Sequence, residues 1–378
     1  MKTDTILAQA GSRRDPLTGA ISMPIHPSAA FQHPALGRST GFDYSRTSNP
    51  TRKALEETIA ALEGGAGAFA FSSGLAALDA VFRLFSPGDA VVVTEDLYGG
   101  TYRLLEKFSR FLNLDFLYLD TSDTAAVVKI LEQPGIKGLF VESPSNPFLK
   151  VADLEALGKA TRERGILFIV DNTFLTPVLC RPMDFGADIT VYSATKYLGG
   201  HNDLIAGLAV ARSKDVSDRL GFIQNATGAV LGPFESWLLL RSLKTLPLRL
   251  KKHEENARNA ASFLAGHKHV KKMYYPGLPD NPGNAVLARQ SAGFGAMIAF
   301  EVDSRARVEH ILSSVKVFMF AESLGAPESL ITFPLVQTHA DMDAAVLDRL
   351  GLHDRLLRLS IGLEDPSDLL GDLAAVLE

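Results

Sequence analysis

The chain has 378 residues, of which 46% are hydrophobic and 21% are charged, and its formal net charge at pH 7 is −5. This composition is ordinary for a soluble globular protein, and the length suggests two domains with ample material for a core. The mildly acidic balance leaves no basic surface of the kind that binds nucleic acid or an anionic membrane, so we expect small metabolites as partners.

Cysteine and histidine usage argues against two further kinds of site. Cys180 is the single cysteine, so neither an intrachain disulfide nor a thiolate zinc cluster can form. The nine histidines are scattered without metal-ligand spacing, and we predict no metal site. The amino-terminal sequence MKTDTILAQAGSRRD lacks the apolar core of a signal peptide, and no apolar run approaches membrane-spanning length. We therefore expect a cytoplasmic protein.

The amino-terminal stretch lacks the periodicity of regular structure. Residues 1–48 are rich in Pro, Ser and Gly, which predicts an extended arm that buries no core of its own. The Asn49-Pro50 turn that follows predicts the start of a helix over 53–62, and the Gly64-Gly65 pair ends it.

A second helix is predicted directly after the sequence FAFSSG at 69–74. Its apolar positions fall on one stripe, formed by Leu75, Leu78, Phe82 and Phe85. A helix that begins after two serines and a glycine presents free backbone N–H groups and the positive end of its dipole, which together attract an anion. A plain serine cap with a close-packed glycine explains the same residues. The sequence lacks G-x-G-x-x-G here, which argues against a dinucleotide fold.

From residue 90 onward, strand-like and helix-like segments alternate. This alternation implies crossover units and predicts an α/β protein with a mainly parallel sheet. The predicted strands are 90–94, 116–120, 138–143, 166–170, 189–193 and 208–211, and the predicted helices are 100–111, 124–132 and 153–164.

A carboxylate follows the continuous apolar run at 166–170. Asp171 stands where a buried parallel strand ends, and an acid there is costly without a cationic partner. The ring nitrogen of pyridoxal phosphate would be such a partner, because only the protonated ring is a strong electron sink. Taken alone, Asp171 is at least as well explained as the cap of a following helix.

A lysine follows the next predicted strand. The β-branched and aromatic run at 189–193 continues into the polar cluster Ser193-Ala-Thr-Lys196. Ligands of open α/β sheets bind at the carboxyl ends of strands. The hydroxyls of Ser193 and Thr195 beside the Lys196 amine suit a phosphorylated aldehyde, which needs both an anion site and a covalent amine. An isolated S-x-T-K is usually a surface turn, so the upstream carboxylate is what favours the cofactor.

The last third of the chain predicts a second, smaller set of elements. A helical period over 236–264 is interrupted at Pro247, which indicates a hinge or kink between domains. Beyond it we predict strands at 297–302 and 316–320 and helices at 305–314 and 367–377. The chain is therefore expected to have three parts, an arm over 1–48, a large domain over 49–243 and a small α/β domain over 244–378.

The motifs around the carboxylate and the lysine resemble the signature of the Cys/Met-metabolism pyridoxal-phosphate enzymes. They are DNT at 171–173, GAD at 186–188, SATKY at 193–197 and GHND at 200–203. The family includes cystathionine γ-synthase, cystathionine lyases, methionine γ-lyase and O-acetylhomoserine thiolyase. The resemblance covers nearly the whole chain and implies PLP fold type I, the aspartate-aminotransferase-like fold, with pyridoxal 5′-phosphate as the cofactor.

The resemblance implies a role for each matching residue. Lys196 is implied as the catalytic residue joined to the cofactor, and Tyr98 as the aromatic that stacks on the ring and assists proton transfer. Further cofactor contacts are implied for Gly74, Leu75, Asp171, Ser193 and Thr195, and for Tyr44 and Arg46 from a neighbouring subunit. The implied substrate-binding residues are Asn146, Glu322, Ser323 and Arg358.

Without the resemblance, several of these residues have plainer explanations. Arg358 lies in an alternating, strand-like run and reads as a strand arginine paired with an acid. Tyr98 reads as a packed aromatic, Asn146 as part of a proline-rich turn, and Arg46 as a solvated cation beside a packed Tyr44. The resemblance instead makes Arg358 the bidentate clamp for the α-carboxylate of an amino acid.

The implied reaction is γ-replacement on an O-acylhomoserine by cysteine or sulfide, as in bacterial cystathionine γ-synthase and O-acetylhomoserine thiolyase. Cystathionine γ- or β-lyase activity is the alternative, and methionine γ-lyase or aminotransferase activity is less favoured. Gly100 stands where methionine γ-lyases carry cysteine, and Leu324 where some β-lyases carry tryptophan. Glu322 is an acid where the synthases and γ-lyases also have one. The resemblance further implies a homo-oligomer, a tetramer with shared active sites. A cofactor-binding protein without turnover remains as a hypothesis of another class.

Overall fold

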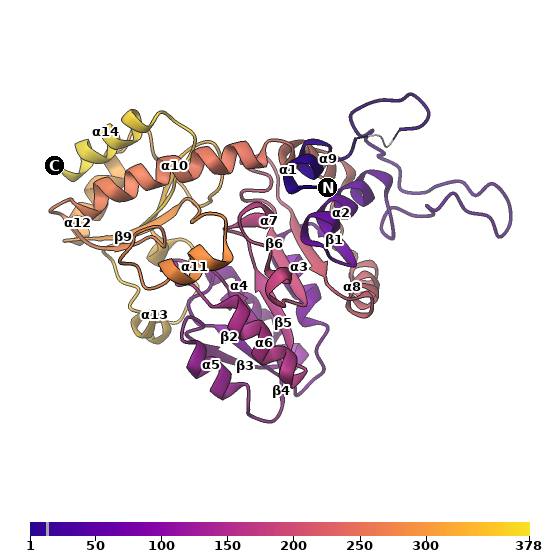
Figure 1. The fold of residues 1–378 in the computed structure, drawn as a ribbon, viewed down its shortest axis with the longest axis horizontal. Helices are drawn as coiled ribbons and strands as arrows, with labels where there is room; N and C mark the ends of the chain where they lie inside the picture. Colours follow the sequence, from indigo (N-terminus) through magenta and orange to yellow (C-terminus); the bar gives the residue numbers. More distant parts are fainter. Residues whose placement is uncertain (13–14) are drawn as a thin grey trace.

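The computed structural model describes residues 1–12 and 15–378. The chain opens with a short helix, α1 (Thr3–Ala8), inside the stretch that the sequence predicted to be extended. It forms because Leu7 is buried completely in the main core. From residue 15 to Asn49 the described chain contains no helix or strand, and Figure 1 shows this arm projecting away from the body of the protein.

Helix α2 (Pro50–Glu63) begins and ends at residues that the sequence marks clearly. The Asn49 side chain accepts hydrogen bonds from the backbone N–H groups of Thr51 and Arg52, and Pro50 occupies the first helical position. Gly64 ends the helix with φ 72°, a left-handed conformation that favours glycine. The helix is thus one turn longer at its start than predicted.

A seven-stranded sheet forms the centre of the larger half, with strand order β1-β7-β6-β5-β4-β2-β3. Strand β7 runs antiparallel to both of its neighbours, and the other pairings are parallel, so the predicted α/β architecture is confirmed. The sequence analysis missed β1, whose residues GAFAF have no β-branched member. The strands are β1 (Gly67–Phe71), β2 (Ala90–Thr94), β3 (Asp115–Leu119), β4 (Ile136–Glu142), β5 (Leu167–Asp171), β6 (Ile189–Ser193) and β7 (Gly207–Ala211).

The helices around this sheet depart from the predictions in two places. Helix α3 ends at Phe82, so Phe85 lies beyond it. The segment predicted as one helix over 100–111 is divided into an α-helical, a π-helical and a 3₁₀ turn. These elements are α3 (Gly74–Phe82), α4 (Gly99–Arg103), η1 (Leu104–Phe108), η2 (Ser109–Leu112), α5 (Thr124–Ile130), α6 (Leu154–Arg164), α7 (Thr176–Leu179), η3 (Pro182–Phe185) and α8 (Lys214–Thr227).

The smaller half is built on a five-stranded sheet with the order β10-β11-β12-β9-β8. The helical run predicted over 236–264 consists of two helices, because Pro247 lies in the first turn of the second helix. The strands are β8 (Val270–Tyr274), β9 (Met297–Val302), β10 (Met319–Phe320), β11 (Leu330–Thr332) and β12 (Leu356–Ser360). The helices are α9 (Pro233–Leu243), α10 (Leu246–Ala265), α11 (Asn284–Gln290), α12 (Arg305–Ser314), η4 (Pro334–Val336), α13 (Ala344–Leu350) and α14 (Pro366–Leu377).

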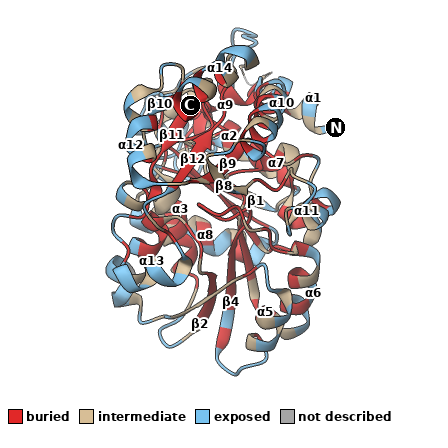
Figure 2. Cartoon of the chain, turned by 90° about the vertical axis from the view of Figure 1, so that its left-hand side faces the viewer, coloured by how far each residue is buried: buried red, intermediate tan, exposed pale blue. Residues whose placement is uncertain are grey.

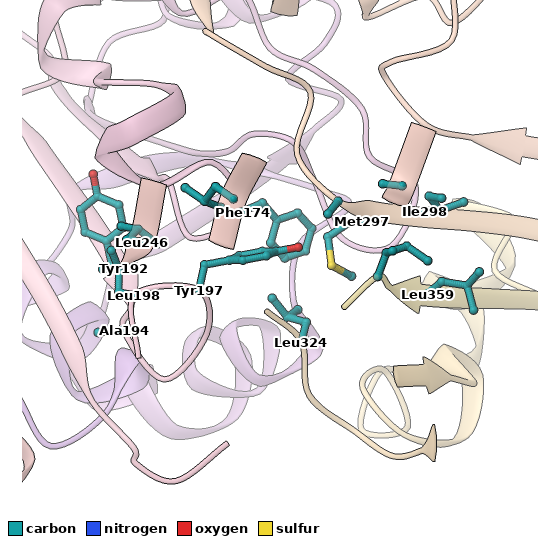
Figure 3. Close-up of a cluster of buried hydrophobic side chains, with 14 of the residues drawn as sticks. Phe174, Tyr192, Ala194, Tyr197, Leu198, Leu246, Met297, Ile298, Leu324 and Leu359 are labelled. Carbon is teal, nitrogen blue, oxygen red and sulfur yellow. The ribbon is translucent and has the colours of Figure 1, made fainter. Parts of the chain in front are cut away.

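The two halves share one apolar core. Figure 2 shows buried residues along the strands of both sheets, while the covering helices expose their outer faces. Figure 3 shows Tyr197 and Leu324 between side chains of the large half and Met297 and Leu359 of the small sheet. This continuity holds the end of the large sheet against the small one. Among the residues described, we find no helix that is both long and apolar enough to cross a bilayer.

Candidate active site

A cavity of about 280 Å³ lies where strands β4, β5 and β6 end. Parallel strands present their carboxyl ends at the same edge of a sheet, and loops from the small half complete the wall. The structure brings together at this cavity most of the residues that the sequence analysis singled out, which are Gly74, Leu75, Tyr98, Asn146, Asp171, Ser193, Thr195, Lys196, Glu322, Ser323 and Arg358.

Lys196 is held just beyond the end of β6. Its Nζ lies 3.3 Å from the Oγ of Ser323 and donates to it. Burial and, to a lesser extent, the positive charge of Arg358 lower the pKa of the Lys196 amine to about 8, while Glu322 opposes the shift. A buried amine with this pKa is a stronger candidate for a nucleophile and proton carrier than a surface lysine.

Two carboxyl groups meet at the ends of β4 and β5. Glu142 and Asp171 are register partners in these parallel strands. Burial raises the pKa of Asp171 to about 6, against the lowering effect of hydrogen bonds from Thr173. Burial also raises the pKa of Glu142 well above its ordinary value, and the Asp171 charge adds to this. The site therefore disfavours two negative charges and favours a cation at this end of the cavity.

The local structure also decides between two explanations of Asp171. Its Oδ1 accepts from the backbone N–H of Thr173 at 2.9 Å, but the next helix, α7, begins only at Thr176. Asp171 thus stabilises a turn and does not cap a helix.

The amino end of α3 forms another part of the cavity wall. Ser73 caps the helix by accepting from the backbone N–H of Ala76, and the first-turn N–H groups of Gly74 and Leu75 have no partner within the helix. A Cβ on Gly74 would lie 3.0 Å from the Cα of Ser193, so glycine is needed for this close packing. The helix amides and Ser193 therefore converge on one anion site, and the Thr195 hydroxyl, which donates to the Ala206 carbonyl oxygen at 3.2 Å, lies in the same lining.

Tyr98 projects into the cavity from the loop before α4. Its backbone N–H donates to the Oε2 of Glu142 at 3.1 Å, which ties this loop to the end of β4. Burial raises the pKa of the Tyr98 phenol, and the Glu322 charge raises it further. The loop packs very closely, because a Cβ on Gly99 would meet the carbonyl oxygen of Thr338 at 2.1 Å.

Arg358 is 2% exposed, yet none of its contacts is a carboxylate ion pair within the described chain. Its Nη1 donates to the Oδ1 of Asn146 at 2.9 Å, and its Nη2 donates to Ser323 O and Thr332 Oγ1 at 3.3 Å each. Its Nε is buried without a partner. Arg358 is therefore not a strand arginine held in an ion pair, and its guanidinium retains a free donor.

Tyr44 and Arg46 are not brought to this cavity within one chain. Tyr44 is 48% exposed, and the Arg46 guanidinium lies 5.5 Å from the centre of its ring. The Nη1 of Arg46 donates to the backbone and side-chain oxygens of Asn225, at 2.6 and 2.9 Å.

Some residues in or beside the cavity had no predicted role. Thr173 belongs to the DNT motif and Glu142 to the predicted strand 138–143, but a partner on another strand is what makes them important. His339 accompanies Asn146, since its Nε2 lies 3.1 Å from the Asn146 carbonyl oxygen and its Nδ1 lies 2.7 Å from Thr338 Oγ1. Burial lowers the pKa of His339 to about 4, so it is neutral at pH 7. It follows an irregular segment, and no periodic pattern in the sequence marks it.

The residues present fit pyridoxal phosphate. A buried carboxyl with a raised pKa calls for a cation such as the ring nitrogen, free helix amides and two hydroxyls suit a phosphate, and a buried amine suits the aldehyde. The free Nε of Arg358 suits the carboxylate of an amino acid.

Comparison with known proteins agrees with this fit. The family described as Cys/Met metabolism PLP-dependent enzyme matches residues 4–378. A cystathionine γ-lyase of Bacillus subtilis is 47% identical over 378 residues, which cover 100% of both chains. A cystathionine γ-synthase of Haemophilus influenzae is 45% identical over 98% of this chain and 96% of that protein. A cystathionine β-lyase of Lactococcus lactis is 44% identical over 99% and 98%.

The fold is also shared with a solved structure. The cystathionine γ-lyase of Lactobacillus plantarum, complexed with L-serine, superposes with a TM-score of 0.97 at 43% sequence identity. The match covers 100% of this chain and 98% of that one.

Proposed function

Because the chain belongs to the Cys/Met-metabolism PLP-dependent enzymes, we propose that it catalyses γ-replacement on an O-acylhomoserine, with cysteine or sulfide as the incoming thiol. The protein is a PLP-dependent enzyme of the cystathionine γ-synthase and lyase group. Bound pyridoxal phosphate supplies an electron sink that stabilises a carbanion on the amino-acid substrate.

In this proposal Asp171 holds the ring nitrogen and keeps it protonated. The amides of Gly74 and Leu75 and the hydroxyls of Ser193 and Thr195 would hold the phosphate, and Tyr98 would contact the ring. The electrostatics of the cavity support this orientation, because its acidic end lies at Asp171 and its anion site lies at the start of α3.

Lys196 would hold the cofactor through its aldehyde, and its amine is placed to move protons at the substrate carbons. The pKa of about 8 leaves about a tenth of the amine neutral at pH 7, whereas an ordinary lysine would be almost entirely charged. Ser323 lies within hydrogen-bond distance and orients the amine. The proton is thus taken by a group whose pKa is close to the working pH, as general base catalysis requires.

Arg358 binds the α-carboxylate of the substrate, and the observation that carries the proposal is its unpartnered Nε donor at the wall of the Lys196 cavity. Asn146 and Thr332 accept hydrogen bonds from the guanidinium and hold it in place. A carboxylate bound there places the α carbon of an amino acid within the same cavity as the lysine.

Glu322 lines the same cavity and is compatible with γ-replacement and with γ-elimination. Its carboxylate would attract the ammonium group of cysteine or of cystathionine, which is the distal charge that both substrates share. The same contact supports γ-elimination of cystathionine as the second candidate, and the relative at 47% identity is a cystathionine γ-lyase. A cystathionine β-lyase is 44% identical to this chain, so β-elimination is the third candidate reaction.

One assay separates these reactions. Purified enzyme is supplied with O-acetyl- or O-succinyl-homoserine and either cysteine or sulfide, and in parallel with cystathionine alone. We expect cystathionine or homocysteine to form from the ester. Release of cysteine and a four-carbon keto acid from cystathionine, without replacement, would instead identify a γ-lyase, and release of homocysteine and pyruvate a β-lyase. Keto acid formed without loss of sulfur would identify an aminotransferase.

We further propose that a second copy of the chain supplies Tyr44 and Arg46 to the phosphate site, within a tetramer. The arm that carries Tyr44 and Arg46 projects from the rest of the chain, and neither residue lines the cavity of the same chain. Both observations support a role in the site of a neighbouring subunit. We also propose that the parts 49–243 and 244–378, each with one of the two sheets, act as domains, and that the enzyme works in the cytoplasm.

A further inference from the structure

A buried polar network lies behind the cavity, on the far side of the strand ends that carry its key residues. Asn172 stands between the cavity residues Asp171 and Thr173, and it is 1% exposed. Its side-chain N–H groups donate to the Cys180 carbonyl oxygen at 2.8 Å and to the Tyr192 hydroxyl at 3.1 Å. The backbone of Asn172 is therefore fixed from the side opposite the cavity.

Tyr192 links this turn to the next strand and to a helix. It is fully buried and directly precedes the cavity residue Ser193, and its hydroxyl donates to the Oε1 of Glu63. Glu63 is the last residue of α2 and is 1% exposed. Figure 3 shows the Tyr192 ring among the buried apolar side chains, with its hydroxyl directed away from Tyr197.

We propose that Glu63, Tyr192 and Asn172 are positioning residues that hold Asp171 and Ser193 at the spacing required to grip the two ends of pyridoxal phosphate. Each of the two cavity residues is the sequence neighbour of one member of the network, on adjacent strands β5 and β6. The inference rests on the proposed cofactor contacts of Asp171 and Ser193.

The free-energy cost of burying these polar groups argues for a role beyond packing. A carboxyl group buried among apolar side chains is unfavourable, and the Oε2 of Glu63 and the Oδ1 of Asn172 have no partner among the described residues. An apolar pair of similar size would fill the same space without this penalty. Hydrogen bonds are directional and apolar contacts are not, so each hydrogen bond of the network fixes the position of a strand end.

The charge state of Glu63 decides which substitution is conservative. Burial raises the pKa of Glu63 to about 8, the positive charge of Arg181 lowers it, and Asp184 raises it. The group is thus neutral at pH 7 and serves as a hydrogen-bond acceptor. Glu63→Gln keeps that acceptor, whereas Glu63→Ala removes it, and Tyr192→Phe breaks the link on the other side.

A matched control exists on the same strand. Thr190 lies two residues before Tyr192 in β6, is fully buried, and has a hydroxyl without a partner in the described chain. Thr190→Val therefore disturbs the same strand and the same depth of the core without touching the network.

The test measures cofactor binding and not turnover. Each apoenzyme is titrated with pyridoxal phosphate by protein fluorescence, and the visible absorbance of the loaded protein is recorded from pH 6 to pH 10. We expect Tyr192→Phe and Glu63→Ala to raise the dissociation constant about fivefold, the effect of one lost hydrogen bond, and to shift the absorbance transition. Glu63→Gln and Thr190→Val should stay within about twofold of the parent protein.

The possible results distinguish a failure of the positioning network from a failure of the proposed cofactor site. If Tyr192→Phe binds the cofactor and titrates like Thr190→Val, the network only packs the core and the inference is wrong. If Glu63→Ala fails to fold, Tyr192→Phe decides alone. Failure of the unmodified protein to attach pyridoxal phosphate at Lys196 would instead overturn the proposed cofactor site.

Discussion

Glu142 and Asp171 occupy partner positions on the neighbouring parallel strands β4 and β5, so a buried and a half-buried carboxyl group end side by side at one wall of the cavity. Burial raises the pKa of Glu142, and the Asp171 charge raises it further. The pair can hold one negative charge readily but not two. A cationic ring nitrogen placed there would draw the negative charge onto Asp171.

The first prediction concerns pH and cofactor affinity. Burial raises the pKa of Asp171 to about 6 in the protein without cofactor, so the carboxylate is charged above that pH and protonated below it. Affinity for pyridoxal phosphate should therefore weaken as pH falls through 6, and this loss should be missing in Asp171→Asn. The measurement is a series of fluorescence titrations between pH 5 and pH 8. Equal pH dependence in both proteins would contradict the assignment of Asp171.

The second prediction concerns the lysine. Lys196→Ala should lower turnover by roughly a thousandfold, because a general base and the covalent attachment are both lost. Its unfolding temperature should change little. Borohydride reduction followed by mass spectrometry of peptides should find the cofactor on Lys196 in the parent protein. Lys137→Ala, at an exposed lysine, is the control and should keep full activity.

The third prediction concerns the guanidinium. Arg358→Lys keeps the charge but loses the planar fork that contacts Asn146 and Thr332 and offers a free Nε. We expect kcat/KM to fall about a hundredfold, mainly through a higher KM for the amino-acid substrate. Steady-state kinetics over a range of substrate concentrations separate the effect on kcat from the effect on KM. An unchanged KM would mean that the substrate carboxylate binds elsewhere.

The fourth prediction concerns stability and pH. The pKa of Glu63 is raised to about 8 in the folded protein from an ordinary value of 4.5, so the folded state binds a proton more tightly than the unfolded chain. Its contribution to stability is present below about pH 4.5 and is lost as the pH rises toward 8. Glu63→Gln removes this dependence, and its unfolding temperature relative to the parent should increase from pH 5 to pH 8. Calorimetry at matched ionic strength would show no such trend if Glu63 were solvated.

The fifth prediction concerns the arm. If Arg46 acts in the site of a second copy, each active site needs Lys196 from one subunit and Arg46 from the other. Assemblies made of Arg46→Ala chains alone, or of Lys196→Ala chains alone, are then inactive. Co-assembly of the two variants should then restore about a quarter of the activity, because half of the pairs are mixed and each mixed pair has one intact site. Separate samples of the two variants, mixed without exchange of subunits, are the control. No gain after exchange would place Arg46 outside the shared site.

Much of the central sheet could be predicted from the sequence because its signals are local. Strands β2 and β6 lie where their apolar runs indicated, since a buried strand with a parallel neighbour must be apolar on both faces. Asp171 and Lys196 could be expected to meet because both follow such strands, and the carboxyl ends of parallel strands share one edge. No knowledge of the small half was required for this step.

Other features depend on partners that are remote in the sequence. The Tyr192 hydroxyl meets Glu63 from the end of α2, and the Arg358 guanidinium meets Asn146 from the end of β4. Nothing near Arg358 in the chain shows that its partners are an amide, a hydroxyl and a carbonyl and not a carboxylate. Likewise, a periodic run over 100–111 does not reveal that its middle is a π-helical turn.

The sequence by itself thus determined where the strands end, and with them which amine and which acid share an edge, because strand formation follows from the spacing of neighbouring apolar residues. The tertiary structure decided what each buried polar group faces. Burial and the charges of remote segments set the pKa of Lys196, Asp171 and Glu63, and those quantities exist only once the chain has folded.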